Sequence, residues 1–518
     1  VENIAKTTTQ DYSYCLYGNI IRFVDNGDNG EDDDLEAIVT YKIDTEKFIL
    51  NKPNQIIITG GDGKKYRERS CTYDNNGNLC ILRQLLSNGE IAVTNLTYNT
   101  FGNPTNVTGP SNHMGQRYSK NFKYDEDTQS HITSITDSFG YESRSEYTGH
   151  AIYYGKPSCT LDINNSPINY AYDAYGRVKE ISIPYSDGQN DNASIRIIYN
   201  TSTTPAYSET KNIAYKNAGG SVTIKAFIDG LKRSIKMEKS ASIGGRATTV
   251  KTDVIYDNMG RIWRETQPYE TSASNYIEYT YDVLDRKKRI FYPDNTNIEY
   301  NYGFEDNYFY SSVIDQKGKV KKTINDVRGL IIYMKEGTGE NIITRYSYNP
   351  MGEITGIIDA NNNHTIINYD NLGRRTRINN SDSGIIEYAY DLTGNLIQKI
   401  TPNLREQGKS IKYRYNYNRR EQIVYPEKSM VTYIYGVPND SDYSAGRIKK
   451  INSTDFREER KYDILGNIST LTRNIFVSVP LSEWKSYTMS YKFDAFGRMR
   501  QLVFQDHEMI TYEYDAGG

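Results

Sequence analysis

Hydrophobic and polar residues alternate along most of the chain. In residues 276–281 and 385–390, aromatic or β-branched side chains recur at nearly every second position. Successive side chains of a β-strand point to opposite faces of a sheet, so a period of two predicts strands. No segment shows the 3.6-residue period of a convincing amphipathic helix. The pattern therefore predicts an all-β chain.

A short phrase recurs where these predicted strands end. It reads Tyr-Asp, two variable residues, Gly, then Arg or Asn and usually an apolar residue. Clear copies begin at Tyr73, Tyr172, Tyr256, Tyr369, Tyr390, Tyr462 and Phe493, a further copy opens at Tyr514, and weaker copies begin at Tyr98, Tyr281, Tyr348 and Tyr417. Tyr348, Tyr369 and Tyr390 follow one another at equal intervals. A phrase that returns at a regular spacing indicates a structural repeat.

Each residue type in the phrase suits a hairpin turn. The Asp carboxylate can accept hydrogen bonds from backbone N–H groups two residues ahead, and Gly adopts positive φ without steric cost. Two strands of six or seven residues and a turn fill about 20 residues, which matches the spacing. We therefore predict one hairpin per repeat, with Gly373 at positive φ and hairpins stacked side by side. The same reasoning makes turn formers, rather than an acid–base pair, of Asp173, Asp257, Asp370 and Asp391.

Because this phrase recurs from Tyr73 to Tyr514, the chain resembles the Rhs/YD-repeat family. In that family such repeats wind into a hollow β-shell, or cocoon, around a toxic C-terminal polypeptide. Residues 18–25, the acidic run that follows and residues 35–41 resemble the segment that leads into the repeats of toxin-complex B-type and virulence-plasmid B-like proteins. The resemblance implies stacked β-hairpins in a curved sheet that is part of such a shell.

The spacing of the repeats divides the chain into three stretches. Residues 1–70 are expected to form an N-terminal β segment with an acidic loop at 25–36, residues 71–250 irregular repeats, and residues 251–518 more regular ones. The chain starts with Val1 and stops inside a repeat, so we expect it to be a piece of a longer protein. It contains no run of 18 apolar residues, and no membrane span is predicted.

Composition favours a thin wall over a solid globule. Only 37% of the 518 residues are hydrophobic, and Tyr contributes 48 residues against 14 Phe and 2 Trp. Rings with a polar tip suit a layer that has water on both faces. A mean hydropathy of -0.72 is also typical of disorder, but the alternation and the aromatic content argue against it. The net charge of -3 gives no reason to expect nucleic acid as a partner.

The search for catalytic, cofactor-binding and metal-binding residues identifies none. The histidines are scattered at His113, His131, His150, His364 and His507. Thr511 stands where a zinc-binding H-E-x-x-H that starts at His507 needs its second His. The Gly-rich residues 59–64 lie between two predicted strands and are interpreted as a turn rather than a phosphate loop. The sequence also lacks the Asp-Pro pair of the motif with which many Rhs shells release their toxin, so we expect no enzyme.

Three further features have two interpretations each. Residues 25–36 carry seven acidic and no basic residues; a solvated loop is favoured over a Ca²⁺ site. Cys71 and Cys80 flank a predicted hairpin, which allows a disulfide, although small apolar strand residues are favoured. The basic clusters at 286–289 and 419–420 are interpreted as a charged face or edge rather than a nucleic-acid patch.

These inferences lead to a hypothesis of encapsulation. The resemblance implies a shell of a secreted or surface-located bacterial toxin, whose partners are an enclosed toxin polypeptide or a C-type shell subunit, and a translocation subunit. The alternative is a cell-surface or wall-associated adhesin, whose Tyr rings would bind carbohydrate or a partner protein. An enzyme is the third hypothesis and has little motif support.

Overall fold

The computed structural model describes residues 8–149, 154–184, 194–213, 221–427, 430–479 and 482–515. The chain divides into two compact units. Unit 1 comprises residues 1–120, 282–289 and 297–428, and unit 2 comprises residues 121–281, 290–296 and 429–518. Each unit therefore combines segments that are far apart in the sequence.

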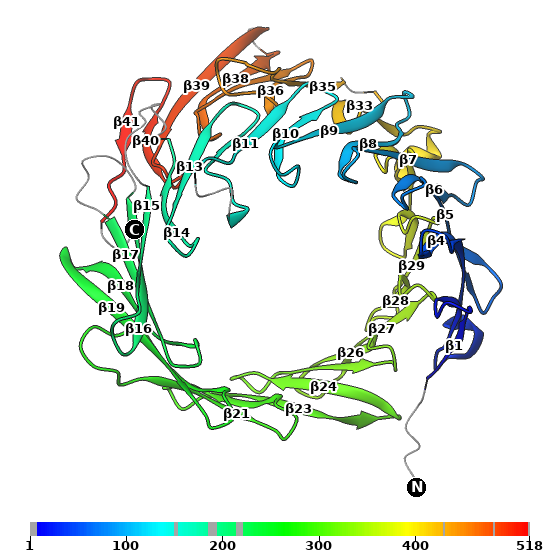
Figure 1. Cartoon of the computed structure of the whole chain (residues 1–518), viewed down its shortest axis with the longest axis horizontal. Helices are drawn as coiled ribbons and strands as arrows, with labels where there is room; N and C mark the ends of the chain where they lie inside the picture. Colours follow the sequence, from blue (N-terminus) through cyan, green and yellow to red (C-terminus); the bar gives the residue numbers. More distant parts are fainter. Residues whose placement is uncertain are drawn as a thin grey trace. The chain divides into compact units, whose positions relative to one another are not determined.

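Unit 1 consists of strands (Figure 1) and, in its described residues, one short α-helix. Its strands are β1 (Thr9–Tyr14), β2 (Ile20–Asn26), β3 (Leu35–Asp44), β4 (Ile49–Gly60), β5 (Lys65–Tyr73), β6 (Leu79–Leu85), β7 (Ile91–Tyr98), β8 (Pro104–Ser111), β23 (Asn297–Glu305), β24 (Tyr308–Ile314), β25 (Val320–Asn325), β26 (Ile331–Gly337), β27 (Ile342–Tyr348), β28 (Ile354–Ile358), β29 (His364–Tyr369), β30 (Arg375–Asn380), β31 (Gly384–Tyr390), β32 (Leu396–Ile400), β33 (Ile411–Asn416) and β34 (Arg419–Val424). The α-helix is α1 (Pro402–Glu406), and a 3-10 turn spans Gly30–Asp32.

Unit 2 is built in the same way. Its strands are β10 (Ile132–Asp137), β11 (Glu142–Glu146), β12 (Cys159–Leu161), β13 (Pro167–Tyr172), β14 (Val178–Ser182), β15 (Ile195–Asn200), β16 (Ala206–Ile213), β17 (Ser221–Ile228), β18 (Ser234–Ile243), β19 (Arg246–Tyr256), β20 (Ile262–Thr266), β21 (Tyr276–Tyr281), β35 (Val431–Tyr435), β36 (Ile448–Asn452), β37 (Phe456–Tyr462), β38 (Ile468–Val477), β39 (Glu483–Phe493), β40 (Met499–Val503) and β41 (Met509–Thr511). Two strands cross the unit boundaries, β9 (Arg117–Tyr124) and β22 (Lys287–Phe291).

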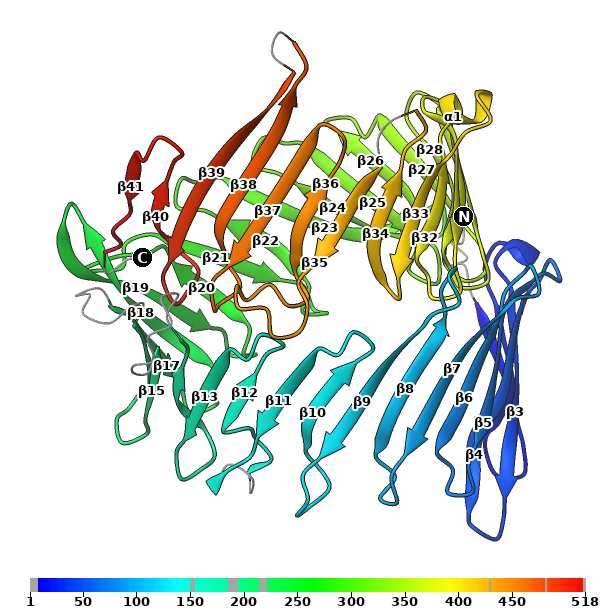
Figure 2. The same cartoon turned by 90° about the horizontal axis from the view of Figure 1, so that it is seen from above.

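The strands pair with their neighbours in the sequence (Figure 2). The 41 strands found in the described residues are assigned to one sheet, and their described registers are antiparallel. In the β31–β32 hairpin, for example, Glu387 faces Ile400 and Ala389 faces Gln398, and the register shifts at Tyr390. The same shift occurs at Tyr172, Tyr256 and Tyr369. The predicted all-β fold of stacked hairpins is confirmed.

The turns of the clear copies follow the predicted geometry. Gly373 has a φ of 79°, and positive φ also occurs at the equivalent Gly77, Gly176, Gly260, Gly394, Gly466 and Gly497. The Gly-rich residues 59–64 form a turn as well, in which the Gly60 N–H donates to the carbonyl of Lys64 at 3.0 Å. Both predictions are therefore confirmed.

The weak copy at Tyr417 was assigned to the wrong place. β33 ends at Asn416 and β34 begins at Arg419, so the turn is only two residues long and Tyr417 lies in it. Tyr417 itself has a positive φ of 51°, whereas Glu421, the fifth residue of the supposed phrase, lies inside β34. The chain therefore turns earlier in this copy, whereas the copy at Tyr281, which also lacks Gly at the fifth position, keeps the phrase turn with Asp285 at a φ of 62°.

Few side chains are deeply buried in the part of the chain that the structure describes. In the described residues, extensive strand contacts occur between consecutive strands. The buried hydrophobic side chains are few and are scattered from Tyr66 to Ala495. The accessible surface is 29785 Å², compared with roughly 19000 Å² expected for a compact monomer of this mass. The large surface agrees with a wall that has two wetted faces.

Candidate functional site

The Asp of each phrase organises its own turn. One Asp173 carboxylate oxygen accepts the N–H groups of Tyr175 and Arg177, both at 2.9 Å. Burial would raise the Asp173 pKa, but these N–H groups and the Arg177 guanidinium outweigh it and lower the pKa. Equivalent bonds are made by Asp257, Asp370 and Asp391. Their predicted role as turn formers is confirmed.

The Arg of the phrase connects one repeat to the next. Arg177 donates from Nε to the second Asp173 oxygen at 2.7 Å, and its guanidinium lies 4.2 Å from the ring centroid of Tyr199 in the following repeat. Such a cation over an aromatic face is attractive. The same Arg–Tyr stacking occurs in the pairs Arg233–Tyr256, Arg261–Tyr281, Arg286–Tyr302, Arg374–Tyr390 and Arg498–Tyr514.

The stacked Tyr also donates a hydrogen bond back to the previous repeat. The Tyr199 hydroxyl donates to the carbonyl of Val178, directly after Arg177, at 3.0 Å. Equivalent bonds run from Tyr256, Tyr281, Tyr302, Tyr390 and Tyr514 to Ser234, Ile262, Lys287, Arg375 and Met499. We call this Asp–Arg–Tyr connection the repeat link. Sequence reasoning missed it, although the regular recurrence of Arg before the next Tyr was its signal.

A second set of contacts joins turns that are far apart in the sequence. In unit 1, turns between residues 27 and 118 meet turns between residues 326 and 417; in unit 2, turns between 137 and 166 meet the loop at 436–447. We call each set a seam. Whereas repeat links join neighbours along the chain, the seams join rows of hairpins that are remote in the sequence.

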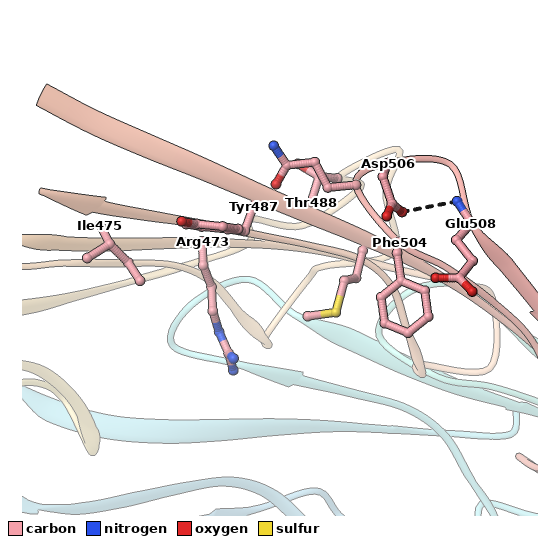
Figure 3. A pocket seen from close by; sticks show the side chains of 9 residues that line it. Arg473, Ile475, Tyr487, Thr488, Phe504, Asp506 and Glu508 are labelled. Atoms are coloured by element: carbon pink, nitrogen blue, oxygen red, sulfur yellow. Dashed lines mark hydrogen bonds between the residues drawn. The ribbon is translucent and has the colours of Figure 1, made fainter. Parts of the chain in front are cut away.

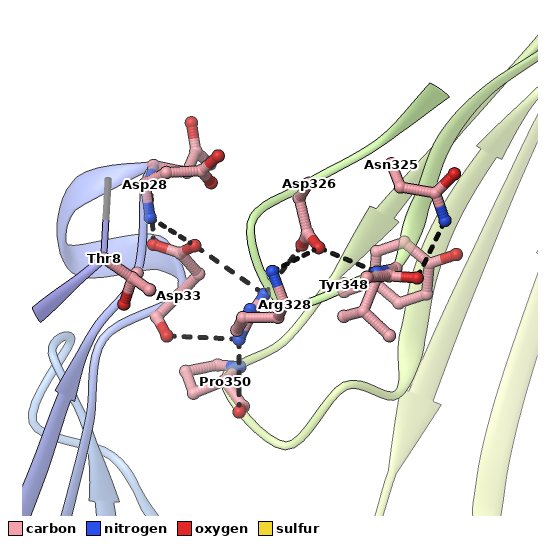
Figure 4. Close-up of polar contacts among 12 residues, drawn as sticks. Thr8, Asp28, Asp33, Asn325, Asp326, Arg328, Tyr348 and Pro350 are labelled. Carbon is pink, nitrogen blue, oxygen red and sulfur yellow. Dashed lines mark hydrogen bonds and ion pairs between the residues drawn. The ribbon is translucent and has the colours of Figure 1, made fainter. Parts of the chain in front are cut away.

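The acidic loop makes the first contact of the unit 1 seam (Figure 4). Asp33 is buried, and its carboxylate accepts the N–H groups of Asp28 and Asn29 at 3.0 Å. Arg328 donates to the Asp33 carbonyl at 3.3 Å and lies 3.7 Å from its carboxylate and 3.5 Å from that of Asp326. The solvated interpretation is therefore wrong for Asp33. In the part of the chain that the structure describes, no group of three or more His, Cys, Asp or Glu is placed to hold a metal.

A buried ion pair makes the second contact. Arg67 and Glu353 lie 2.5 Å apart with side chains only 14% and 16% exposed. Gly373 packs against this pair, because a Cβ there would lie 2.8 Å from Glu353 Oε1 and 3.0 Å from Arg67 Nη2. The adjacent Tyr66 is buried, and burial together with the Asp62 carboxylate raises its pKa to about 12. A polar cavity of about 70 Å³ remains between these turns.

Amide side chains make the third contact. Asn112 donates from Nδ2 to the carbonyl of Tyr417 at 3.0 Å, and the Tyr417 N–H donates to Gln116 Oε1 at 2.8 Å. The N–H of His113 donates to the Asp391 carboxylate at 3.2 Å. Thus the turn between β8 and β9 reaches two turns that follow it much later in the chain.

The unit 2 seam is packed more closely. The Tyr141 hydroxyl donates to the carbonyl of Gly436, and Asn164 donates from Nδ2 to the carbonyl of Ala445 at 3.2 Å. Ala445 is 1% exposed. A Cβ on Gly436 would lie 2.2 Å from Ser444 Oγ and 2.3 Å from its carbonyl oxygen, so the backbone approach requires glycine there.

Charged side chains hold the loop of this seam together. Ser444 is fully buried, and its hydroxyl oxygen lies 2.9 and 2.6 Å from carboxylate oxygens of Asp440 and Asp442, which share its one O–H as acceptors. Lys449 lies 3.0 and 3.3 Å from the same two carboxylates. Burial would raise the pKa of both aspartates, but the bonds to Ser444 and Lys449 prevail and lower it. The cluster is satisfied internally and leaves Ser444 inaccessible to a substrate.

An open cavity of about 790 Å³ lies over β38–β41 (Figure 3). Its lining is mainly apolar, with Ile475, Met489 and Phe504 among the residues. Arg473 in its wall is paired with Glu458 at 2.9 Å. The described residues that line the cavity include no Ser, Cys or His, so they do not combine a nucleophile with a His base.

The histidines and cysteines of the described residues do not gather into one cluster. His131 stacks on Tyr147 at 4.8 Å, His113 lies at the unit 1 seam, and His364 and His507 lie in β29 and a turn; His150 falls outside the described residues. Cys71 faces Leu82 across the β5–β6 hairpin, and both Cys71 and Cys80 are free. The disulfide interpretation is therefore wrong, because the register puts the two residues out of phase.

The basic clusters lie within the sheet. Arg286 takes part in a repeat link, Arg289 lies 2.9 Å from Glu299, and residues 419–420 open β34. These contacts agree with a charged sheet face. Within the described ranges, no helix is long and apolar enough to cross a membrane.

Comparisons with known proteins find similarity in structure only. No family model matches the chain, and no curated protein matches it in sequence. A crystal structure of TcdB2-TccC3-TEV superposes with a TM-score of 0.80 at 11% identity, over 99% of this chain and 37% of that one. A crystal structure of TcdB2-TccC3 gives 0.79 at 12% identity over 99% and 35%. The Photorhabdus luminescens Tc holotoxin pore with a TccC3 mutation gives 0.78 at 12% identity over 98% and 36%.

This chain has the fold of TcdB2-TccC3. It spans little more than a third of the length of those structures. At such low identity the likeness concerns the fold alone. The predicted resemblance to a toxin-complex shell agrees with it at the level of the fold.

Proposed function

We propose that this chain is a wall segment of a toxin-complex-type shell that encloses a polypeptide, and that its role is confinement rather than catalysis. The observation that carries the proposal is the distribution of the specific contacts. Repeat links recur from Asp173 to Tyr514, and the seams join whole rows of hairpins. Such contacts make a continuous layer and do not converge on one reactive centre.

Confinement follows from physical continuity. A polypeptide behind a layer without gaps cannot reach its target and cannot be reached by a protease. Neighbouring strands are held by ladder hydrogen bonds and repeat links, whereas the rows of hairpins in each unit meet through side chains and turns near the strand ends. Ladder hydrogen bonds alone would leave adjacent rows of hairpins unconnected. The seams therefore provide the additional contacts that confinement of a polypeptide requires.

The proposed partners follow from the structures with the same fold. These are named as TcdB2-TccC3 complexes and as a Tc holotoxin pore, which supports a toxin polypeptide or C-type subunit as one partner and a translocation subunit as another. We propose a secreted or surface location in a bacterium on the same grounds.

The test is protection of an enclosed polypeptide. The protein is expressed in its natural sequence context together with its candidate cargo, and the complex is treated with a nonspecific protease. We expect the cargo to stay intact until the wall is unfolded with denaturant. Cargo that is digested at the same rate with and without a folded wall would refute encapsulation.

A carbohydrate-binding adhesin is the second candidate. It is favoured by a cavity of about 600 Å³ in unit 2 whose lining includes Tyr154, Tyr170 and Tyr172 together with the hydroxyl side chains of Thr148 and Ser158. Aromatic faces stack on sugar rings, and hydroxyls can bind their polar edges. A ligand that binds only the folded state raises the melting temperature. A glycan panel that stabilises the native protein but not its Tyr170→Ala variant would favour this function.

A further inference from the structure

Two neighbouring turns of unit 1 both depart from the repeat phrase. The turn between β8 and β9 has Asn112 where the phrase has Asp and Gln116 where it has Arg or Asn. The turn between β33 and β34 has two residues and places Tyr417 at a φ of 51°. A bulky residue at positive φ is an outlier that persists only where surrounding contacts stabilise it. The two unusual turns contact each other.

The contacts use both polar groups of the Tyr417 backbone. Its N–H donates to Gln116 Oε1 at 2.8 Å. Its carbonyl accepts from Asn112 Nδ2 at 3.0 Å and from Asn395 Nδ2 at 3.1 Å. Gln116 Nε2 also donates to Asn416 Oδ1 at 3.0 Å. The amide side chains of Asn112 and Gln116 thus hydrogen-bond the N–H and carbonyl groups of Tyr417 and the side chain of Asn416 in this turn.

The two departures from the phrase in the β8–β9 turn, Asn112 and Gln116, provide the groups that bind the Tyr417 turn. Asn112 Oδ1 accepts the N–H groups of Met114 and Gln116 at 2.9 Å, as the Asp of the phrase does, while its Nδ2 is an added donor that Asp lacks. Nδ2 also donates to Gln116 Oε1 at 2.9 Å, which orients that acceptor toward Tyr417. The same residue therefore forms its own turn and recognises a remote one.

We propose that the turns at 112–116 and 416–418 form a register lock, a specificity-determining contact that fixes which hairpins of the two rows in unit 1 meet. A shift by one repeat would place an ordinary phrase turn opposite Asn112, and its paired donors and acceptors would be lost. Ladder hydrogen bonds between the described strands do not set this register, because they join consecutive strands. The lock rests on the geometry of unit 1; only its use in closing a wall rests on the proposed function.

Asn112→Asp tests the lock while its own turn is kept. The carboxylate still accepts the two N–H groups of the turn, but it places an oxygen against the Tyr417 carbonyl and Gln116 Oε1. Amide hydrogen exchange of Tyr417 is measured in the whole chain. We expect it to accelerate on the order of tenfold, as the loss of a neutral hydrogen bond and the repulsion of two facing oxygens imply, while β29–β30 exchange unchanged.

Asn99→Asp is the matched control. Asn99 has the same turn position, with Oδ1 accepting the N–H groups of Phe101 and Asn103 at 3.0 Å, and Asp is the usual phrase residue there. Exchange at Tyr417 should not change in this variant. An unchanged Tyr417 rate in Asn112→Asp, or equal acceleration in β29–β30, would overturn the lock.

A wild-type measurement decides the question if Asn112→Asp does not fold. The Tyr417 amide lies in a two-residue turn, and its acceptor is Gln116 Oε1. Slow exchange at Tyr417 that becomes faster in Gln116→Ala supports the lock. If the Tyr417 amide of the wild-type protein exchanges as fast as that of an unstructured peptide, the register lock is overturned. Both readouts are independent of whether a polypeptide is enclosed, so they separate the lock from the proposed function.

Discussion

Both seams join hairpins that are remote in the sequence, but they use different kinds of contact. In unit 1, short turns meet through side chains, with Arg67 and Glu353 as an ion pair and Asn112 as an amide donor. In unit 2, a long loop packs its backbone against remote turns, and Gly436 and Ala445 leave no space. Side-chain contacts can be weakened one at a time, whereas close backbone packing fails when any atom is added. We therefore expect the unit 1 seam to respond to polarity and the unit 2 seam to volume.

The largest effect is expected from adding volume to the unit 2 seam. Gly436→Ala would bring a Cβ within 2.2–2.4 Å of Ser444, so the loop must move and unfolding free energy should fall by about 3 kcal/mol. Denaturant unfolding measures the change. Gly339→Ala is the control, because a Cβ there meets nothing within 4 Å. Equal effects of the two substitutions would contradict the close packing.

A smaller effect is expected from Gly373→Val in unit 1. Valine at a φ of 79° is strained, and its Cβ would also displace the Arg67–Glu353 pair, so we expect a loss of about 2 kcal/mol. Gly318→Val has a similar φ of 74° but open space around the Cβ, and should lose about 1 kcal/mol from strain alone. The difference between their denaturant midpoints isolates the seam. Identical midpoints would show that Gly373 contributes only its turn.

Acid should loosen the loop of the unit 2 seam. The pKa values of Asp440 and Asp442 are lowered below the ordinary 3.8 in the folded state: burial opposes this, but Lys449 and Ser444 prevail. Their stabilising contribution is therefore present above about pH 4 and is lost as the pH falls through the folded values. Urea midpoints measured from pH 6 down to pH 2.5 should decline less steeply in Asp442→Asn. If the urea midpoints of the variant and the wild type declined in parallel, Asp442 would not be a source of the acid sensitivity.

The smallest effect is expected at two cysteines, one in each unit. Cys15 takes the place of the phrase Asp in Tyr14-Cys15-Leu-Tyr-Gly18-Asn19; burial opposes a lower thiol pKa, but hydrogen bonds from Tyr17 and Asn19 lower it. Burial and the Glu146 charge raise the pKa of Cys159. Because the thiolate is the nucleophile, iodoacetamide at pH 7.5 should label Cys15 faster than Cys159. Mass spectrometry measures the two labelling rates.

Cys15→Asp provides a check on the same turn. It restores the common residue of the phrase, whose carboxylate accepts the N–H groups of the turn more strongly than a thiol does. The melting temperature should therefore rise slightly. Faster labelling of Cys159 than of Cys15 would contradict the expected order of the thiol pKa values, and a lower melting temperature of Cys15→Asp would show that a carboxylate does not stabilise this turn.

Some of these contacts were predictable because they are local. The Asp370 carboxylate reaches N–H groups two and four residues ahead, and Gly373 takes positive φ within the same turn. The repeat link spans one repeat, so the regular spacing of Arg374 and Tyr390 was a usable signal. Tyr417 was misassigned because Tyr-Asn also begins true copies, and a missing glycine was no warning, since Asp285 replaces it in the intact turn of the copy at Tyr281.

The secondary structure is encoded locally: the alternation specifies strands, the phrase specifies hairpin turns, and the spacing specifies one hairpin per repeat. These features depend on interactions within one repeat or between adjacent repeats, where chain connectivity limits the choice of partner. The seams, in contrast, could be identified only from the three-dimensional arrangement of the strands. The partners of Asn112, Arg67 and Asp33 lie in a remote part of the sequence, and many turns of similar composition compete for them. Which of them meet depends on the accumulated geometry of all the intervening strands, which no local pattern encodes.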